Sequence, residues 1–160
     1  MSVIGFTGTR NGMTDMQRKW VTHMLGLQPK GSTGLHGDCV GADSDFDAIC
    51  KSLGMQTDCL PCTFDSMRAH CTAAIAEPKP PMQRNRDIVA RADKVIACPP
   101  TKERIKKGSG TWATIGFAEK SGKPLAIVYP DGEFEIKNIA IRQAPSDPAD
   151  EAANLAAEGT

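Results

Sequence analysis

Residues 108–130 constrain the fold of this chain most, because they read as a glycine-rich turn, a helix and a wholly apolar strand in immediate succession. The apolar run at 95–99 comes before them, so the two together have the pattern of one βαβ unit. A helix that starts directly at the turn leaves its first backbone N–H groups without helical acceptors. Such a terminus can hold an anion, and phosphate is the first ligand that we expect there.

Strand and helix patterns alternate along most of the chain. Apolar, β-branched runs predict strands at 3–7, 33–36, 55–60, 94–98 and 124–129, with one more within 133–141. Helices are expected after a cap at Thr14 or Asp15 and at 42–53, 66–76, 82–91 and 111–121. This alternation predicts an α/β fold: a Rossmann-like, doubly wound, mainly parallel sheet of five to six strands with helices on both faces.

Length and composition fit one domain. The chain has 160 residues, and we expect a Rossmann-like domain at 1–140 followed by an acidic, Ala- and Pro-rich tail at 141–160. No apolar run approaches the roughly 18 residues of a membrane helix, and the first ten residues lack a signal-peptide pattern. We therefore expect a cytoplasmic protein without a membrane partner, whose six cysteines are free thiols.

The charges are unevenly placed although the net charge is zero. Residues 79–123 hold eleven basic and four acidic residues, and they include the glycine-rich turn. Residues 124–160 hold two basic and seven acidic residues. A basic middle third favours an anionic ligand, although a solvated charged face would give the same pattern.

In a doubly wound sheet, ligands bind beyond the carboxyl ends of the strands, where the strand order reverses. Four segments follow expected strands closely and are therefore candidates, at 8–12, 36–43, 98–100 and 108–111. Three of them contain glycine, which lets the backbone approach a ligand. His36 stands at one strand end, where it is either a ligand contact or a histidine satisfied within the protein.

Several short motifs occur in a characteristic order: GTR at 8–10, GxxxGAD at 37–43, and RNRDIVARADKVIACP at 84–99 before GSGTWAT. This combination resembles the SLOG superfamily of Rossmann-like proteins. The superfamily includes the Lonely Guy phosphoribohydrolases, which activate cytokinins, and the DNA-processing protein A recombination mediators. In shape and length the chain is most similar to small uncharacterised nucleotide-binding members, often encoded by phages and bacteria. The resemblance covers roughly residues 3–130.

The resemblance to Lonely Guy enzymes implies a nucleoside 5′-monophosphate N-glycosidase, with Arg84 and Thr111 at matching positions. However, Ala113 stands where those enzymes have a glutamate, and the ten residues 99–108 replace their PGG sequence. An enzyme of this kind would need Asp38 or Asp43 to supply the missing carboxylate beside Arg84. The resemblance therefore favours binding of a nucleotide or a nucleotide-derived phosphorylated ligand, with the glycosidase as an alternative.

The resemblance to DNA-processing protein A implies a further alternative, the binding of single-stranded DNA. SGTWAT fits the SGxxxTA turn of those proteins through Thr114, and the basic run KERIKK at 102–107 lies next to it. One tyrosine and two tryptophans leave few rings for base stacking. Relatives often pair through helices that cover the sheet, so the resemblance also implies a homodimer.

The expected ligand contacts come from the segments that follow strands and from Arg84 and Asn85, which the resemblance to the small uncharacterised members implies. Phosphate is expected on the N–H groups of residues 110–112, with Arg10 and Arg84 as bidentate donors. Asp38 could accept a hydrogen bond from a ribose hydroxyl. Asp43 could instead cap the N-terminus of the second helix. Trp112 either stacks on a base or packs into the sheet. The full set is Gly8, Thr9, Arg10, Gly37, Asp38, Gly41, Asp43, Arg84, Asn85, Ser109, Gly110, Thr111 and Trp112.

One cluster has the ligand types of a tetrahedral zinc site, the pattern C-x2-C-x7-H-C formed by Cys59, Cys62, His70 and Cys71. Against zinc, Cys59 lies in an expected strand, and a second CxxC pair is missing. The intervening Pro61 and Phe64 also match a non-metal pattern of the superfamily. We expect no metal and no cofactor, and zinc is the minor alternative.

Overall fold

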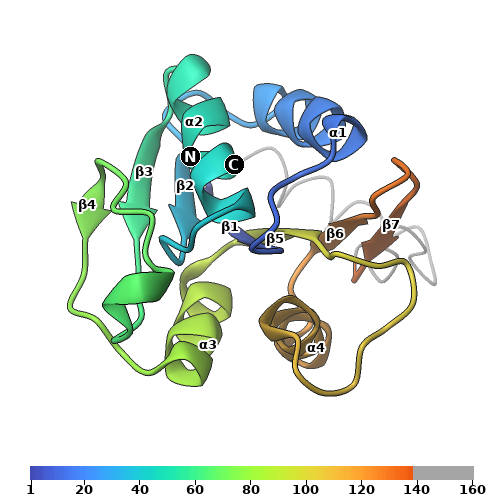
Figure 1. Ribbon diagram of the computed structural model, residues 1–160. Helices are drawn as coiled ribbons and strands as arrows, with labels where there is room; N and C mark the ends of the chain where they lie inside the picture. Colours follow the sequence, from blue (N-terminus) through green and yellow to red (C-terminus); the bar gives the residue numbers. More distant parts are fainter. Residues whose placement is uncertain (139–160) are drawn as a thin grey trace, which may run out of the picture.

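A seven-stranded sheet forms the centre of the protein, and the computed structural model describes residues 1–138 (Figure 1). The order across the sheet is β4-β3-β2-β1-β5-β6-β7; all pairs are parallel except β6–β7. The strands are β1 (Val3–Gly8), β2 (Thr33–His36), β3 (Gln56–Cys59), β4 (Ala74–Ile75), β5 (Lys94–Cys98), β6 (Leu125–Val128) and β7 (Phe134–Lys137). The predicted fold class is confirmed, with more strands than the five to six expected.

Four α-helices of the described chain cover the two faces of the sheet. Figure 1 shows α1 (Asp15–Gly26) and α2 (Ala42–Ser52) on one face, and α3 (Pro81–Arg91) and α4 (Gly110–Ser121) on the other. Thr14 caps α1 in a capping box with Gln17, as predicted for one of the two alternatives. Gly122, in the left-handed conformation with φ 72°, ends α4.

The helix expected at 66–76 is wrong. The structure has a short 3₁₀-helix, η1 (Asp65–Met67), and then the two-residue strand β4 at the edge of the sheet. Tertiary contacts override the local helical pattern: the Asp38 carboxylate accepts hydrogen bonds from the Arg68 side chain and the Cys71 N–H. His70 has a positive φ of 57°, which interrupts any helix there.

The core has a cluster on each side of the sheet. Between the sheet and the α1–α2 layer, the rings of Phe6 and Phe46 stack with their centroids 4.5 Å apart. On the α3–α4 side, Trp112 and Ile115 pack against strands β5 and β6. Gly34 lets α2 approach β2 closely, because a Cβ there would lie 2.6 Å from the Cys50 sulfur.

The order in which strands are added to the sheet reverses at β1. This strand pairs with β2 on one side and with β5 on the other. β1 leads to α1 on one face, whereas β5 leads to α4 on the opposite face. The loops that leave the carboxyl ends of these two strands therefore diverge and open a crevice.

The structure describes only part of the chain to which the domain predictions refer. The expected tail at 141–160, with the last two residues of the expected domain, lies outside residues 1–138. No helix within 1–138 is long and apolar enough to cross a membrane.

Replacing Phe46→Ala should lower the free energy of unfolding by about 3–5 kcal/mol, because it removes a fully buried ring and leaves a cavity beneath Phe6. Urea unfolding followed by circular dichroism measures the change. The matched control is Leu27→Ala at a side chain that is 72% exposed, which should change stability by no more than about 0.5 kcal/mol. Equal effects of the two substitutions would contradict the assignment of the core.

Candidate functional site

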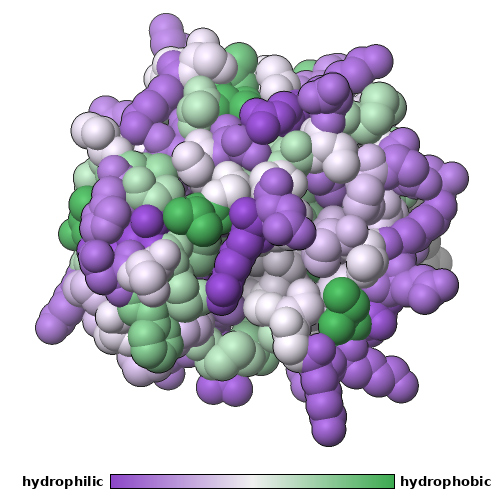
Figure 2. All heavy atoms as spheres, in the orientation of Figure 1, coloured by the Kyte–Doolittle hydropathy of each residue, from purple (hydrophilic) through white to green (hydrophobic). Residues whose placement is uncertain are grey.

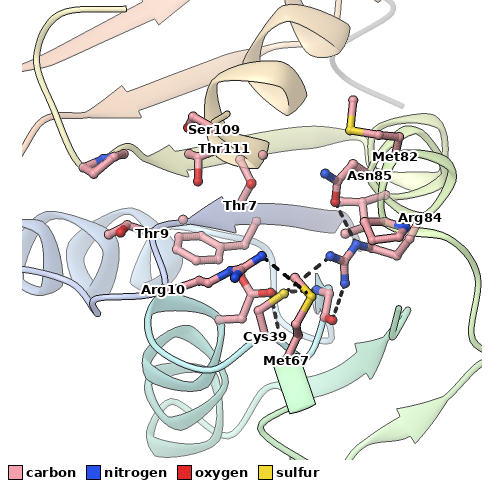
Figure 3. Close-up of a pocket in the computed structure, with 18 of the residues that line it drawn as sticks. Thr7, Thr9, Arg10, Cys39, Met67, Met82, Arg84, Asn85, Ser109 and Thr111 are labelled. Atoms are coloured by element: carbon pink, nitrogen blue, oxygen red, sulfur yellow. Dashed lines mark hydrogen bonds between the residues drawn. The ribbon is translucent and has the colours of Figure 1, made fainter. Parts of the chain in front are cut away.

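A pocket of about 410 Å³ lies in the crevice between the loops after β1, β2 and β5 (Figure 3). The N-terminal turns of α3 and α4 form its remaining walls. Most of the predicted site residues line it, namely Gly8, Thr9, Arg10, Gly37, Asp43, Arg84, Asn85, Ser109, Gly110 and Thr111. Asp38, Gly41 and Trp112 are not among the residues that line it.

The first turn of α4 presents backbone donors to the pocket. Ser109 is the N-cap, and its hydroxyl accepts the N–H of Trp112 at 3.2 Å. The Trp112 N–H, which was expected to hold phosphate, is thus used by the protein. The N–H groups of Gly110 and Thr111 have no acceptor within the described part of the chain. Thr111 as a residue is only 6% exposed, and its hydroxyl, which forms no hydrogen bond within residues 1–138, is accessible from the pocket.

Arg84, from the first turns of α3, is buried with only neutral partners. Its Nε donates to the Asn85 Oδ1 at 2.7 Å, and its Nη1 donates to the carbonyl oxygens of Gly37 and Leu60. Among residues 1–138, no carboxylate forms a salt bridge with it. A Cβ at Gly37 would collide with this guanidinium, which explains the glycine at that position.

Asn85 lies between the Arg84 guanidinium and the start of α4. Because its Oδ1 accepts from Arg84, the amide orientation is fixed and the Nδ2 donors remain. The Nδ2 atom lies 3.7 Å from the position that a Cβ of Gly110 would take. Asn85 is 9% exposed, so a nearly buried amide points its free donors at the start of α4.

Arg10 lies on the loop after β1 and is exposed. Its Nη2 contacts only the Met67 sulfur, at 3.7 Å. Gly41 supports this loop from outside the pocket: it has a φ of 92°, and a Cβ there would collide with the Arg10 carbonyl group. Gly41 therefore shapes the site without lining it.

Asp43 lines the pocket but is committed to the protein backbone. Its Oδ2 accepts the N–H groups of Gly37 and Cys39, both at 3.1 Å, and so holds the loop between β2 and α2. Burial raises the pKa of this carboxyl group, although the nearby His36 and Arg84 oppose the rise. Asp43 is the one carboxyl group that lines the pocket within the described residues.

Asp38, predicted as a ribose contact, is fully buried and turned away from the pocket. It accepts from the Arg68 Nε at 3.0 Å and from the Cys71 N–H at 2.8 Å. Burial alone would raise the pKa of Asp38, but these two donors outweigh it and hold the pKa below its usual value. Its role is to anchor the segment that contains η1.

Trp112 packs into the sheet rather than facing the pocket. It is 4% exposed and belongs to the core cluster on the α3–α4 side. Its Nε1 donates to the Thr101 hydroxyl at 3.3 Å, and the Arg104 guanidinium lies 5.0 Å from its ring centroid. Of the two alternatives for Trp112, the packing role holds.

The loop at 99–109 is tied to the protein by ion pairs. Lys102 contacts Glu133 and Asp131, and Arg104 contacts Glu119 at 2.7 Å. Two of the basic residues in KERIKK are therefore neutralised by neighbouring elements. On the face shown in Figure 2, hydrophilic side chains predominate and hydrophobic ones are scattered.

Several residues that line the pocket were not foreseen, including Thr7, Asn11, Cys39, Met67, Met82 and Ile105. Thr7 could have been found, because it ends the strand expected at 3–7, directly before the GTR motif. Met67 could not, since it comes from the stretch expected as a helix. Burial raises the pKa of the Cys39 thiol to about 11, with a further contribution from Asp43, so this cysteine stays protonated near neutral pH.

The residues of the zinc alternative do not come together. Within 1–138, the one group of three potential ligands that lie close together is His36, Asp47 and Cys59. The His36 Nδ1 accepts the Asp38 N–H and its Nε2 contacts Asp47, both at 2.9 Å, so both ring nitrogens are occupied. His36 is thus satisfied within the protein, and the geometry does not support a metal site.

Replacing Asp38→Asn should lower the free energy of unfolding at pH 7 by roughly 1–3 kcal/mol, because two buried donors lose their charged acceptor. The pKa of Asp38 is lower in the folded than in the unfolded chain, so its carboxylate stabilises the fold above about pH 4 and loses this effect as the pH falls. Urea unfolding at pH 7 and at lower pH should show the gap to the unsubstituted protein narrowing in acid. The control is Asp65→Asn, whose side chain is 83% exposed; a gap independent of pH would contradict the assignment.

Comparison with known proteins connects the fold to proteins of solved structure. No family model matches the sequence, and no curated protein matches it. The molybdenum cofactor binding protein of Rippkaea orientalis is 22% identical, with a TM-score of 0.61 over 80% of this chain and 76% of that one. The molybdenum cofactor carrier protein of Chlamydomonas reinhardtii is 19% identical, with a TM-score of 0.55 over 79% and 76%.

DNA-processing protein A of Helicobacter pylori, a single-stranded DNA binding protein, is 21% identical, with a TM-score of 0.57 over 79% of this chain and 64% of that one. Identities of this size establish the fold alone. At the level of the fold, the comparison agrees with the resemblance read from the sequence motifs: the chain has the Rossmann-like fold that DNA-processing protein A also has.

Proposed function

We propose that the protein binds a nucleotide, or a nucleotide-derived phosphorylated small molecule, in the pocket at the carboxyl ends of the strands. One observation carries the proposal. Thr7, Asn85 and Thr111 are at most 9% exposed, and the little that is exposed includes, in each, a polar atom that faces the pocket and forms no hydrogen bond among residues 1–138. No fully buried side-chain nitrogen or oxygen of the described residues lacks a hydrogen-bond partner, so these three groups are accessible donors and acceptors with which a ligand in the pocket can form hydrogen bonds.

The chemistry of the surrounding donors favours a phosphate. The free N–H groups of Gly110 and Thr111 stand at the positive end of the α4 dipole. Arg84 adds a buried positive charge that forms no salt bridge among residues 1–138, although it interacts with Asp43 through space. An unpaired buried charge is energetically unfavourable, and a bound anion would offset that penalty.

The size and the remaining walls of the pocket favour a whole small molecule over a free phosphate ion. Its volume of about 410 Å³ lies in the range of small-molecule sites. Apolar side chains of Met82, Ile88 and Ile105 face it beyond the donors and suit a heterocyclic base. Solved structures with this fold include proteins that bind or carry the molybdenum cofactor, which supports small-molecule binding in general.

Replacing Thr111→Val should weaken the binding of nucleoside monophosphates about tenfold, because it removes one hydrogen bond to a charged group while keeping the side-chain shape. Isothermal titration calorimetry with AMP, GMP, CMP and UMP measures the loss. The matched control is Thr22→Val on the exposed part of α1, which should leave the affinity unchanged. Absence of binding to all four nucleotides and to inorganic phosphate would refute the proposed function.

The N-glycosidase remains the second candidate, because Asp43 lines the pocket near Arg84. Three features weigh against it. The carboxylate of Asp43 already accepts two backbone N–H groups, and Ala113 stands at the position of the expected glutamate. The other possible substitute, the carboxylate of Asp38, does not line the pocket and is bonded to Arg68 and the Cys71 N–H.

We expect no free base when the pure protein is incubated with nucleoside monophosphates and the mixture is separated by chromatography. The Asp43→Asn variant, checked for folding by circular dichroism, serves as the reference. Release of base by the unsubstituted protein, abolished in the variant, would replace the binding proposal with the enzymatic one.

Single-stranded DNA binding has less support. The aromatic ring that lines the pocket within 1–138 belongs to Phe6, which is fully buried and stacked on Phe46. Base stacking on an accessible ring is a main source of affinity for single strands. The homodimer and the cytoplasmic location stay predictions.

A further inference from the structure

The Nη2 atoms of two arginines on the pocket wall have only sulfur atoms as hydrogen-bond acceptors among residues 1–138. The Arg84 Nη2 donates to the Cys39 Sγ at 3.4 Å, and the Arg10 Nη2 donates to the Met67 Sδ at 3.7 Å. No salt bridge of either arginine exists among the described residues. Figure 3 shows both guanidinium groups on the side of the pocket where Cys39 and Met67 lie.

Sulfur is a weak acceptor for these donors. A guanidinium forms its strong hydrogen bonds with carboxylate or phosphate oxygens, at shorter distances and with the help of charge. The Cys39 thiol is also neutral near pH 7, because burial and Asp43 raise its pKa. The Nη2 atoms of Arg10 and Arg84 can therefore form stronger hydrogen bonds with an anion than they form with sulfur.

The acidic group nearest to this pair does not neutralise it. Asp43 influences Arg84 through space, but its Oδ2 accepts the N–H groups of Gly37 and Cys39, and no salt bridge joins it to either arginine. Asp38 is paired with Arg68 on the other side of the loop. The positive charge of Arg10 and Arg84 therefore stays directed at the pocket.

These arginine ends are distinct from the donors at the start of α4. Asn85 stands between them, since its Oδ1 accepts from the Arg84 Nε while its Nδ2 faces Gly110. In Figure 3, Ser109 and Thr111 lie across Thr7 from the two guanidinium groups. The pocket thus has two neighbouring sets of donors, one neutral at α4 and one cationic at the loops after β1 and β2.

We propose that the natural ligand carries two adjacent anionic groups, as a nucleoside diphosphate does. One phosphate occupies the donors of Gly110, Thr111 and Asn85, and the second group occupies the Nη2 ends of Arg10 and Arg84 in place of the sulfur contacts. This inference rests on the proposed function, because it divides one phosphate-binding pocket into two subsites.

The test compares inorganic phosphate with pyrophosphate by isothermal titration calorimetry, at fixed ionic strength. The unsubstituted protein should bind pyrophosphate at least about tenfold more tightly, the gain from one or two additional charge-assisted hydrogen bonds. The Arg10→Gln variant, at an exposed side chain, should lose most of that preference. Arg86→Gln is the matched control on the same protein, since Arg86 lies over Phe117 and outside the pocket, and it should keep the preference.

The outcomes separate this inference from the proposed function. Phosphate binding with no gain for pyrophosphate would overturn the second subsite and leave the proposed function standing. The same would follow if Arg10→Gln weakened phosphate and pyrophosphate by equal factors. No binding of either anion would overturn both. Repeating the comparison with AMP and ADP shows whether the preference persists when the phosphates carry a nucleoside.

Discussion

The burial of the Arg84 guanidinium is the interaction on which the site depends. Its nitrogens reach the carbonyl groups of Gly37 and Leu60 and the side chain of Asn85, so one residue of α3 holds the ends of β2 and β3 together. These acceptors are all neutral. The arginine can therefore order the loops and still keep its charge available, because none of its bonds cancels that charge.

The acidic residues of the loop at 37–43 (GDCVGAD) stabilise the backbone around the site. Asp43 and Asp38 accept backbone N–H groups on either side of the loop, and His36 is held between Asp47 and the Asp38 N–H. Polar groups at such depth are stable only when their hydrogen bonds are complete. Carboxylates that maintain the backbone in this way are poorly placed to act on a ligand. This is why the geometry favours a binding site over a catalytic one.

The ligand-facing groups show the opposite pattern. Thr7, Asn85 and Thr111 have polar atoms left over, and the tips of Arg10 and Arg84 meet only sulfur. The complete networks hold the loops in place, whereas the polar atoms that remain accessible in the pocket support the proposed binding site. Both kinds lie within one crevice because the strand order reverses at β1, where loops from opposite faces of the sheet diverge.

The sequence by itself determined the alternation of strands and helices, the order of the motifs and the glycine-rich turn at the start of α4, because periodicity, caps and glycines act over a few residues. It also placed most pocket residues, since parallel strands bring their carboxyl ends to one edge. Only the tertiary structure decided that Asp38 faces Arg68, that Trp112 packs into the sheet, and that residues 66–76 are not a helix. Those outcomes depend on contacts between segments that are about 10 or more residues apart in the sequence. In such contacts, burial and charge pairing outweigh the local preference for helix or strand.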